Sequence, residues 1–313
     1  MTRPNVNLFF ASDDGYIPFL AVTLASLREH IDSSRHYDIK ILNTGISRKN
    51  RERILTKFSS KNLEIEFCDV SAAVENISER LHTRDYYSKT TYYRLFIPRL
   101  FPDLKKALYL DCDIVLRSDV GELFDTDMGE NLVAAASDGF VECTPRLHSY
   151  VTERVGVRYH GDYFNAGVLL MNLEKMREAG FEERFTELLG SIKFDVAQDQ
   201  DYLNAICNRR SLKVSEVWNA MPGFYRLKEA PKLIHYNLDS KPWRKSGIEF
   251  EEYFWKYALS SGFMREIEEI KMRSASPEKS EKETRNLIEV AEEQGRDMIR
   301  NLKIRMMLKS ILA

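Results

Sequence analysis

Apolar and polar positions follow one another along the first 70 residues in a pattern that predicts strands alternating with helices. Short apolar runs rich in β-branched and aromatic residues predict strands, and longer segments with apolar residues three or four apart predict helices. The strands are expected at 6–11, 38–43 and 63–70, and the helices at 18–31 and 47–58. Pro18 suits the first helical position, and Ser47 is placed to cap the second helix. This alternation is typical of an α/β fold with a largely parallel sheet.

The same pattern continues to about residue 245, where the sheet is expected to end. Further strands are predicted at 107–113, 132–137, 166–173 and 232–236, and helices at about 90–100, 174–190, 198–208 and 249–262. Beyond 262 the chain becomes charge-dense and poor in apolar residues, which is typical of a linker or an exposed helix. We therefore expect one α/β domain over 1–262 and a charged helical extension over 263–313.

The end of that extension, "RDMIRNLKIRMMLKSILA", predicts a basic amphipathic helix. It carries five basic residues and a single acidic one, Asp297, interleaved with Met, Ile and Leu. Such a helix can lie on an anionic membrane surface. It can equally dock on the body of the protein or on a second subunit, and the sequence leaves these alternatives open.

Composition limits the classes of function. The 313 residues are 43% apolar, and 46 basic residues balance 48 acidic ones. That balance gives no basic field that would attract nucleic acid. The four cysteines are scattered without a CxxC pair, as expected of reduced thiols. Neither a signal peptide nor a run of about 20 apolar residues is visible. We expect a cytoplasmic protein, either free or peripheral at the inner face of the cell membrane.

The stretch "ALYLDCDIVL" places Asp111 and Asp113 where an apolar strand ends. Burying an ionised carboxylate costs several kcal/mol unless the group is paired or bound to a cation. Residues two apart in a strand point to the same side, and ligands of open α/β sheets bind at the carboxyl ends of strands. The pair therefore favours a divalent metal that binds a phosphate, although an isolated DxD can also cap a turn or pair with arginine. Cys112 is expected to face the opposite side, in the core.

His235 and Lys241 extend this interpretation. His235 follows the strand-like "KLI", again at an expected sheet edge, and Lys241 comes six residues later. Two carboxylates and one imidazole suit Mn²⁺ or Mg²⁺, with the imidazole favouring Mn²⁺. A nearby lysine can contribute charge to a diphosphate without ligating the metal.

Six segments in this order resemble glycosyltransferase family 8, the retaining enzymes of the GT-A fold that include lipopolysaccharide galactosyl- and glucosyltransferases and glycogenin. Together they cover about residues 6 to 245. The segments are "FFASDDGY" (9–16), "SKTTYYRL" (88–95), "YLDCDIVLRSDVGELF" (109–124), "FNAGVLLMNLEKMR" (164–177), "QDQDYLNAI" (198–206) and "HYNLDSKPW" (235–243). The resemblance implies a Rossmann-like, mixed and largely parallel sheet flanked by helices.

The resemblance also implies roles for the matching positions. Asp111, Asp113 and His235 would hold Mn²⁺, and Lys241 would bind the diphosphate of a UDP-sugar. The remaining donor contacts would come from Ala11, Asp13 and Tyr16 at the nucleoside, from Ser88 and Cys112 in the matching segments, and from Arg94, Asp138, Asn165 and Ala166 at the sugar. Asp199 and Gln200 fall beneath the anomeric carbon. Because an amide oxygen is a poor nucleophile, we expect front-side attack with Gln200 stabilising positive charge, while double displacement remains the alternative.

Three positions depart from the family pattern. Gly15 stands where relatives often have Asn, and Tyr86 where some have His. Leu238 stands where many have Gly for a close backbone approach to the diphosphate.

Rival functions explain fewer residues. A phosphatase of the haloacid dehalogenase type also uses a DxD, but it needs the motif on its first strand. A dinucleotide-dependent oxidoreductase lacks its GxGxxG. A degenerate nucleotide-sugar-binding protein would be expected to have lost part of the set that is intact here.

The sequence leaves the sugar and the acceptor open. Glucose and galactose differ in the orientation of one hydroxyl, which spacing cannot resolve. The expected enzyme is a UDP-hexose-dependent hexosyltransferase of cell-envelope polysaccharide synthesis, acting on a glycan or glycolipid, with homo-oligomers left open. Residues 140–162 are expected to form a lid-like loop, with further acceptor contacts from about 210–230.

Overall fold

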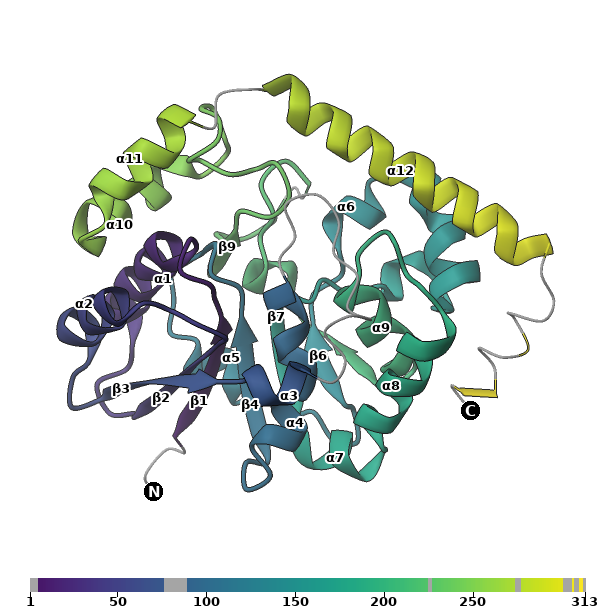
Figure 1. The fold of residues 1–313 in the computed structure, drawn as a ribbon, viewed down its shortest axis with the longest axis horizontal. Helices are drawn as coiled ribbons and strands as arrows, with labels where there is room; N and C mark the ends of the chain where they lie inside the picture. Colours follow the sequence, from purple (N-terminus) through teal and green to yellow (C-terminus); the bar gives the residue numbers. More distant parts are fainter. Residues whose placement is uncertain are drawn as a thin grey trace. The chain divides into compact units, whose positions relative to one another are not determined.

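The computed structural model of the chain describes residues 5–75, 89–224, 227–273 and 277–300, together with Met306, Ser310 and Ile311. Contacts divide the chain into two compact units, each built from separate stretches of sequence. The first unit consists of residues 1–72, 107–127 and 215–277, and the second of residues 73–106, 128–214 and 278–313. Figure 1 labels the elements of both units.

The first unit contains four parallel strands in the order β3-β2-β1-β4. Their bounds are β1 Val6–Ala11, β2 Tyr37–Asn43, β3 Leu63–Asp69 and β4 Lys106–Leu110. Two helices connect the first three strands, α1 at Ile17–His30 and α2 at Arg48–Phe58. Ser47 caps α2 by accepting a hydrogen bond from the backbone N–H of Asn50, as predicted. Pro18 occupies the second position of α1 rather than the expected first.

The pairing of β1 with β4 brings two loops to the same edge of this sheet. Leu8 lies opposite Leu108 and Phe9 opposite Tyr109. Because the two strands are parallel, their carboxyl ends lie side by side, and the loop after β1 therefore meets the chain after β4. The Cys112 thiol donates to the carbonyl oxygen of Ala11 over 3.2 Å, which fixes that meeting point.

A short antiparallel pair completes the strands of the first unit: β5 at Ile114–Leu116 and β9 at Leu233–His235. Ile114 lies opposite His235. The buried Thr23 hydroxyl of α1 donates to the carbonyl oxygens of Cys112 and Ile114, each over 2.8 Å. These bonds hold the segment after β4 against α1. The remaining helices of this unit are α5 Gly121–Phe124, η5 Glu216–Trp218, α10 Glu251–Ser261, which packs on α1, and α11 Met264–Arg273.

The second unit contains three strands in the order β7-β6-β8, with β6 antiparallel to β7 and parallel to β8. The strands are β6 Val133–Ala135, β7 Val168–Asn172 and β8 Ser211–Lys213. Its helices up to residue 206 include η1 Lys89–Phe96, α4 Ile97–Leu100, α7 Leu173–Glu178, α8 Phe181–Ser191 and α9 Asp199–Ile206. A short helix, α3 at Ser71–Glu75, lies where the chain passes from the first unit to the second.

Residues 140–162 of the second unit are mostly helical rather than an irregular loop. They form α6 Gly139–Glu142, η2 Pro145–Leu147, η3 Tyr150–Val155 and η4 His160–Asp162. The helix α12, Pro277–Arg300, packs on this segment. Arg146 forms a two-pronged ion pair with Glu292, over 2.6 and 2.8 Å. A Cβ atom on Gly295 would lie 3.3 Å from the backbone nitrogen of Tyr150, so helix and segment touch closely there.

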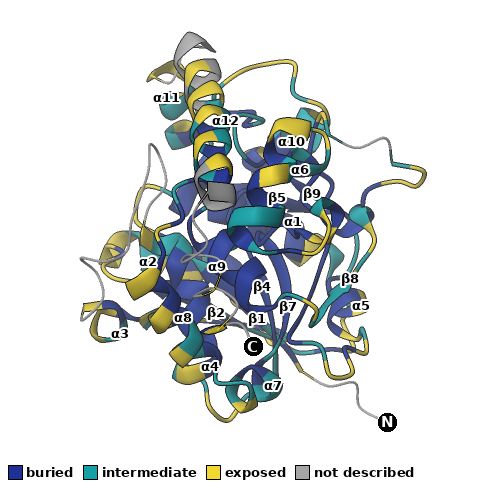
Figure 2. Ribbon diagram, turned by 90° about the vertical axis from the view of Figure 1, so that its right-hand side faces the viewer, coloured by how far each residue is buried: buried dark blue, intermediate teal, exposed yellow. Residues whose placement is uncertain are grey.

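The pattern of buried residues along α12 explains why the composition of this segment does not predict that it packs on the protein. Leu287, Ala291 and Gly295, four residues apart, are buried, whereas Arg285, Glu289 and Glu293 are exposed. Figure 2 shows this narrow blue stripe on a largely yellow and teal helix. Most of the expected basic tail, 301–305, 307–309 and 312–313, lies outside the described residues, and the boundary at 262/263 stays a prediction.

The expected fold class is confirmed, with local corrections. The strands of three residues at β5 and β8 are too short to show a period and were not predicted. The helix predicted at 174–190 is two helices, because Gly180 adopts a left-handed conformation with φ of 64°. The strand expected at 232–236 is β9, so the last strand of the described residues ends ten residues before the expected end of the sheet near 245. No helix in the described ranges combines the length and apolar character that crossing a bilayer requires.

Candidate active site

Asp111 and Asp113 follow directly after β4, at the sheet edge described above. The Asp113 side chain is buried, while that of Asp111 keeps 26% of its surface exposed. Tyr109 donates to Asp111 Oδ1 over 3.0 Å and so orients that carboxylate. The pair therefore presents one buried and one accessible carboxylate at the end of a buried strand.

His235, the last residue of β9, faces both carboxylates. Its Nε2 atom lies 3.2 Å from Asp113 Oδ1 and 3.7 Å from Asp111 Oδ2. One ligand atom from each of the three residues lies within 4.8 Å of the others. The β5–β9 pairing produces this arrangement, because it sets His235 opposite Ile114, the residue after Asp113.

Lys241 supplies the remaining charge. Its ammonium donates to Asp113 Oδ2 and is itself buried. Lys241 also lies 5.5 Å from the centroid of Trp243, which stacks on Phe19 of α1 at 4.0 Å. Trp243 is thus a packing anchor for its loop. Burial raises the pKa of the Asp113 carboxyl, but the pKa still lies below its usual range, and the charge of Lys241 is the largest effect that lowers it.

These residues fit a divalent cation. Two carboxylates and an imidazole are a donor set that Mn²⁺ or Mg²⁺ accepts. Asp113 Oδ1 is buried and has no hydrogen-bond partner, although His235 Nε2 is near. An ionised oxygen left in that position requires a positive charge. The three side chains would hold the ion, and Lys241 would stand beside it.

The loop after β1 carries the residues expected at the nucleoside. Ala11 ends β1, and Asp13 Oδ1 accepts a hydrogen bond from the backbone N–H of Tyr16 over 3.0 Å. Asp13 is exposed and Tyr16 is partly exposed. A Cβ atom on Gly15 would meet only Asp13 Oδ1, at 3.4 Å, so the loop has room for the Asn of relatives. Cys112 is buried as expected of a core residue.

A second cluster, which we call the amide cluster, lies in the second unit and contains Arg94, Asp138, Asn165, Ala166, Asp199 and Gln200. Gln200 Nε2 donates to Asp138 Oδ2 over 3.0 Å, and its Oε1 accepts from the N–H of Ala166 over 2.9 Å. Asn165 Nδ2 donates to the same Asp138 oxygen over 2.9 Å. Both ends of the Gln200 amide are thereby fixed.

Arg94 ties Asp199 into the amide cluster. Its Nε atom lies 3.1 Å from Asp199 Oδ2, and its Nη1 donates to the carbonyl oxygen of Ala166. Both side chains of this ion pair are buried. The positive charge of Arg94 neutralises a carboxylate that is otherwise buried. Ser88 and Tyr86 lie outside the described residues.

The sequence analysis did not identify Asp201, which holds the helix of the amide cluster in place. Asp201, in α9, is fully buried and accepts hydrogen bonds from Tyr150, Tyr163 and the N–H of Ala197, over 2.7 to 2.9 Å. Burial raises the pKa of Asp201 to about 6, against the opposing effect of these donors. The residue before α9's first turn, Gln198, has a φ of 48°, which is strained for a residue other than glycine. The hydrogen bonds of Asp201 hold α9 in place, and α9 carries Asp199 and Gln200.

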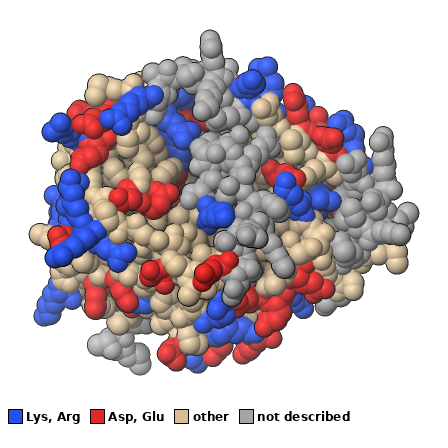
Figure 3. Space-filling view, viewed as in Figure 1, with Lys and Arg blue, Asp and Glu red and all other residues tan. Residues whose placement is uncertain are grey.

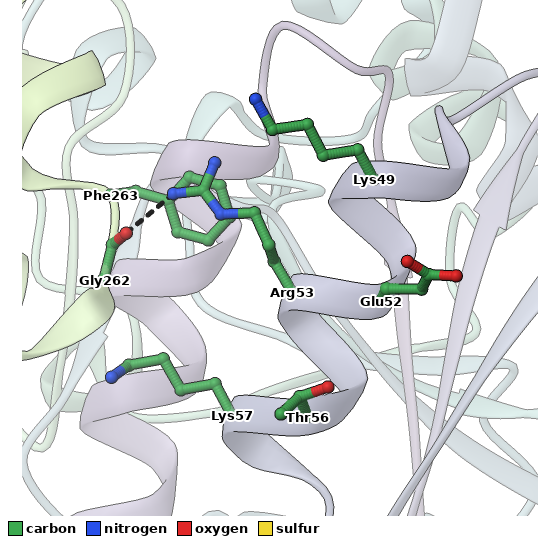
Figure 4. Close-up of a pocket in the computed structure, with 7 residues that line it drawn as sticks. All are labelled: Lys49, Glu52, Arg53, Thr56, Lys57, Gly262 and Phe263. Carbon is green, nitrogen blue, oxygen red and sulfur yellow. Dashed lines mark hydrogen bonds between the residues drawn. The ribbon is translucent and has the colours of Figure 1, made fainter.

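A surface pocket of about 430 Å³ lies apart from these residues, along α2 (Figure 4). It is lined by Lys49, Glu52, Arg53, Thr56, Lys57, Gly262 and Phe263. Arg53 bonds to Gly262 and Glu266 and lies 3.6 Å above the Phe263 ring. The pocket therefore marks the joint between α2 and the α10–α11 turn. Basic and acidic side chains are mixed over the face in Figure 3, in keeping with a net charge of −2.

Known proteins resemble the chain in sequence and in fold. General stress protein A of Bacillus subtilis is 26% identical over 262 residues, 77% of this chain and 88% of that protein. Lipopolysaccharide 1,2-glucosyltransferase of Escherichia coli is 25% identical, over 83% and 79%. The galactosyltransferase LgtC, in complex with donor and acceptor sugar analogues, superimposes with a TM-score of 0.69 at 26% identity, over 82% and 96%.

A bifunctional glycosyltransferase, WbbM, gives a TM-score of 0.72 at 29% identity, over 86% of this chain and 52% of its own. These solved structures share the GT-A fold that the sheet and its helices predict. The sequence profile of glycosyl transferase family 8 matches residues 7–247, which is most of the chain. The chain therefore belongs to glycosyl transferase family 8.

Proposed function

We propose that the protein transfers glucose or galactose from a UDP-sugar to a glycan or glycolipid acceptor, with retention of the anomeric configuration and with Mn²⁺ as cofactor. The observation that carries the proposal is the cluster of Asp111, Asp113 and His235 with Lys241 beside it. Carboxylates alone would repel a diphosphate, whereas a divalent cation and a lysine would attract it.

The proposal assigns the diphosphate to this first cluster. The bound metal would act as a Lewis acid that stabilises the UDP leaving group. Asp113 would keep its negative charge at neutral pH because its pKa is lowered, chiefly by Lys241. Lys241 would exchange part of its pairing with Asp113 for a diphosphate oxygen. Ala11, Asp13 and Tyr16 would seat the uridine.

The proposal assigns the hexose to the amide cluster. Arg94, Asp138, Asn165 and Ala166 offer charged and neutral hydrogen-bonding groups of the kind that hold sugar hydroxyls. Asp199 is paired with Arg94, and Asp138 accepts bonds from Asn165 and Gln200. A carboxylate engaged in this way is a weakened nucleophile, which favours front-side attack over double displacement.

In the front-side route, Gln200 would stabilise positive charge at the anomeric carbon. Its amide is held at both ends, so its oxygen needs little reorganisation as charge develops. The leaving phosphate would accept the proton of the acceptor hydroxyl. Support for a cell-envelope acceptor comes from the lipopolysaccharide glucosyltransferase among the relatives.

The test is a UDP-release assay with UDP-glucose or UDP-galactose, run with Mn²⁺ or with EDTA. We expect release from one of the two donors with Mn²⁺ only, and its loss in Asp113→Ala. Asp103→Asn is the matched control, because Asp103 is exposed just before β4 and should leave turnover unchanged. Release that persists in EDTA would refute metal dependence. UDP-sugar binding without turnover would support a degenerate binding protein instead.

A further inference from the structure

We propose that Asn219 is a positioning residue that fixes the tautomer of His235, so that Nε2 carries a lone pair toward the metal position. The part of this proposal that concerns metal binding rests on the proposed function, whereas the tautomer of His235 does not. Asn219 is fully buried and His235 is 2% exposed. The Asn219 side-chain oxygen, Oδ1, lies 2.9 Å from His235 Nδ1.

Hydrogen-bond chemistry gives this contact a direction. An amide oxygen only accepts hydrogen bonds, so the proton between the two atoms belongs to His235 Nδ1. A neutral imidazole holds one proton, and Nε2 is then left with a lone pair. Metal-ligating histidines commonly donate their other N–H to a carbonyl or carboxylate in this way.

Nε2 faces the two carboxylates of the metal cluster. Nε2 lies 3.2 Å from Asp113 Oδ1, and this oxygen has no hydrogen-bond partner. With the proton on Nδ1, two acceptors face one another across that distance. Such a pair is unfavourable in a buried site unless a cation compensates it; Lys241 is that cation in the metal-free protein, because it donates to the other oxygen of Asp113, and the metal would add a second one. Asn219 thus turns the histidine into a metal ligand rather than an ion-pair partner of Asp113.

The backbone holds Asn219 in place for this role. Asn219 follows η5 as its C-cap residue and donates its N–H to the carbonyl oxygen of Glu216 over 3.0 Å. Its neighbour Ala220 bonds to β9 on both sides: its N–H donates to Leu233, and its carbonyl accepts from His235, each over 2.9 Å. These bonds fix the register between Asn219 and the imidazole, so the side-chain contact does not depend on a flexible loop.

The first measurement is the tautomer of His235 in metal-free protein, by ¹H–¹⁵N NMR of the imidazole rings. The pH is set well above the usual imidazole pKa of about 6.5. His235→Gln assigns the signal among the six histidines. We expect the proton on Nδ1 in the wild type and in Asn219→Asp, which keeps an acceptor. In Asn219→Leu, which removes it, we expect the Nε2–H form to appear. An Nε2–H or doubly protonated ring in the wild type would overturn the proposal.

The second measurement is Mn²⁺ affinity by isothermal titration calorimetry. We expect Asn219→Leu to weaken binding by about 10- to 100-fold, the usual loss when the partner of a metal-bound histidine is removed. Asn219→Asp should bind at least as well as the wild type. Equal affinity in Asn219→Leu would contradict the proposal.

Asn43→Leu is the matched control. Asn43 is also fully buried in the first unit but bonds to the backbone of Ile41 and Cys68 rather than to an imidazole. It should lose stability without any change in the His235 tautomer or in Mn²⁺ affinity. If Asn219→Leu does not fold, the comparison of Asn219→Asp with the wild type still tests the tautomer. A wild type that binds no Mn²⁺ would refute the proposed function alone, because the tautomer is measured without metal.

Discussion

Two buried aspartates, Asp113 and Asp201, differ in what surrounds them. Burial raises the pKa of both carboxyls. At Asp113 the charge of Lys241 is the largest effect that opposes burial, and the pKa falls below its usual range. At Asp201 the donors are two tyrosine hydroxyls and a backbone N–H, and the pKa rises to about 6. One carboxylate is kept ionised by cations, and the other is held by neutral donors.

The difference separates two tasks. An ionised carboxylate with an unpartnered oxygen is prepared for a further cation, as a metal ligand must be. A carboxyl whose oxygens are all satisfied by tyrosines and backbone serves to fix a helix, here α9 with Gln200. The chain thus uses the same residue type once for chemistry and once for position.

The largest expected effect comes from Lys241→Met, which removes the cation beside Asp113. Breaking a buried charge pair costs about 3–5 kcal/mol. Asp113 has a lowered pKa, so its contribution is present above the unfolded pKa of about 3.8 and lost as the pH falls below it. We expect the variant to lose this stability at neutral pH and to gain more in Tm from Mn²⁺ than the wild type. Thermal unfolding with and without Mn²⁺ checks this, and a wild-type response would contradict it.

A smaller effect is expected from Asp201→Asn. Because the folded pKa of Asp201 is raised to about 6, its contribution to stability is fully present below about pH 4 and is lost as the pH rises through 6. A shift of this size corresponds to about 3 kcal/mol. Urea unfolding between pH 4 and pH 7 should therefore show a decline in the wild type that is absent from the variant. Parallel profiles would show that Asp201 does not titrate in this range.

Gln200→Ala should act on chemistry alone. We expect kcat to fall by about 10- to 100-fold, the loss that follows removal of one stabilising group. Mn²⁺-dependent UDP binding should not change, because the Gln200 amide bonds to Asp138 and Ala166 of the amide cluster. Gln294→Ala is the matched control, since Gln294 bonds to Asp195 from α12. A Gln200→Ala enzyme with full kcat would refute the assigned role, and weaker UDP binding would break the separation of the two clusters.

The smallest effect is expected at Leu238, between His235 and Lys241. Leu238 has a φ of 46°, in the left-handed region that glycine enters at little cost and other residues rarely adopt. Leu238→Gly relieves about 1 kcal/mol of backbone strain in the folded state. It also loses a similar amount of folding stability, because glycine gives the unfolded chain more conformational entropy. We expect a change near zero for Gly and a clear destabilisation for Leu238→Val, measured by urea unfolding. An equal loss of unfolding free energy in both variants would show that the left-handed conformation of Leu238 does not determine the effect.

The sequence predicts the metal cluster better than its support. Asp111 and Asp113 could be found because they follow an apolar strand of the parallel sheet, and His235 because it ends a short apolar run, although that run forms a strand antiparallel to β5. Asn219 and Asp201 could not, because their roles arise from contacts with residues 16 and 51 positions away. The docking of α12 could not be predicted for a related reason: among the α12 residues whose burial is described, the buried ones, Leu287, Ala291 and Gly295, lie four residues apart within a charge-dense composition.

The most direct test of the account is the number of Mn²⁺ ions bound per chain, measured by calorimetric titration. The account predicts one ion in the wild type and in Gln200→Ala, and none in Asp113→Asn. One ion in Asp113→Asn would contradict the central claim, because the metal would then be bound elsewhere. Loss of the ion in Gln200→Ala would show that the two clusters do not act separately.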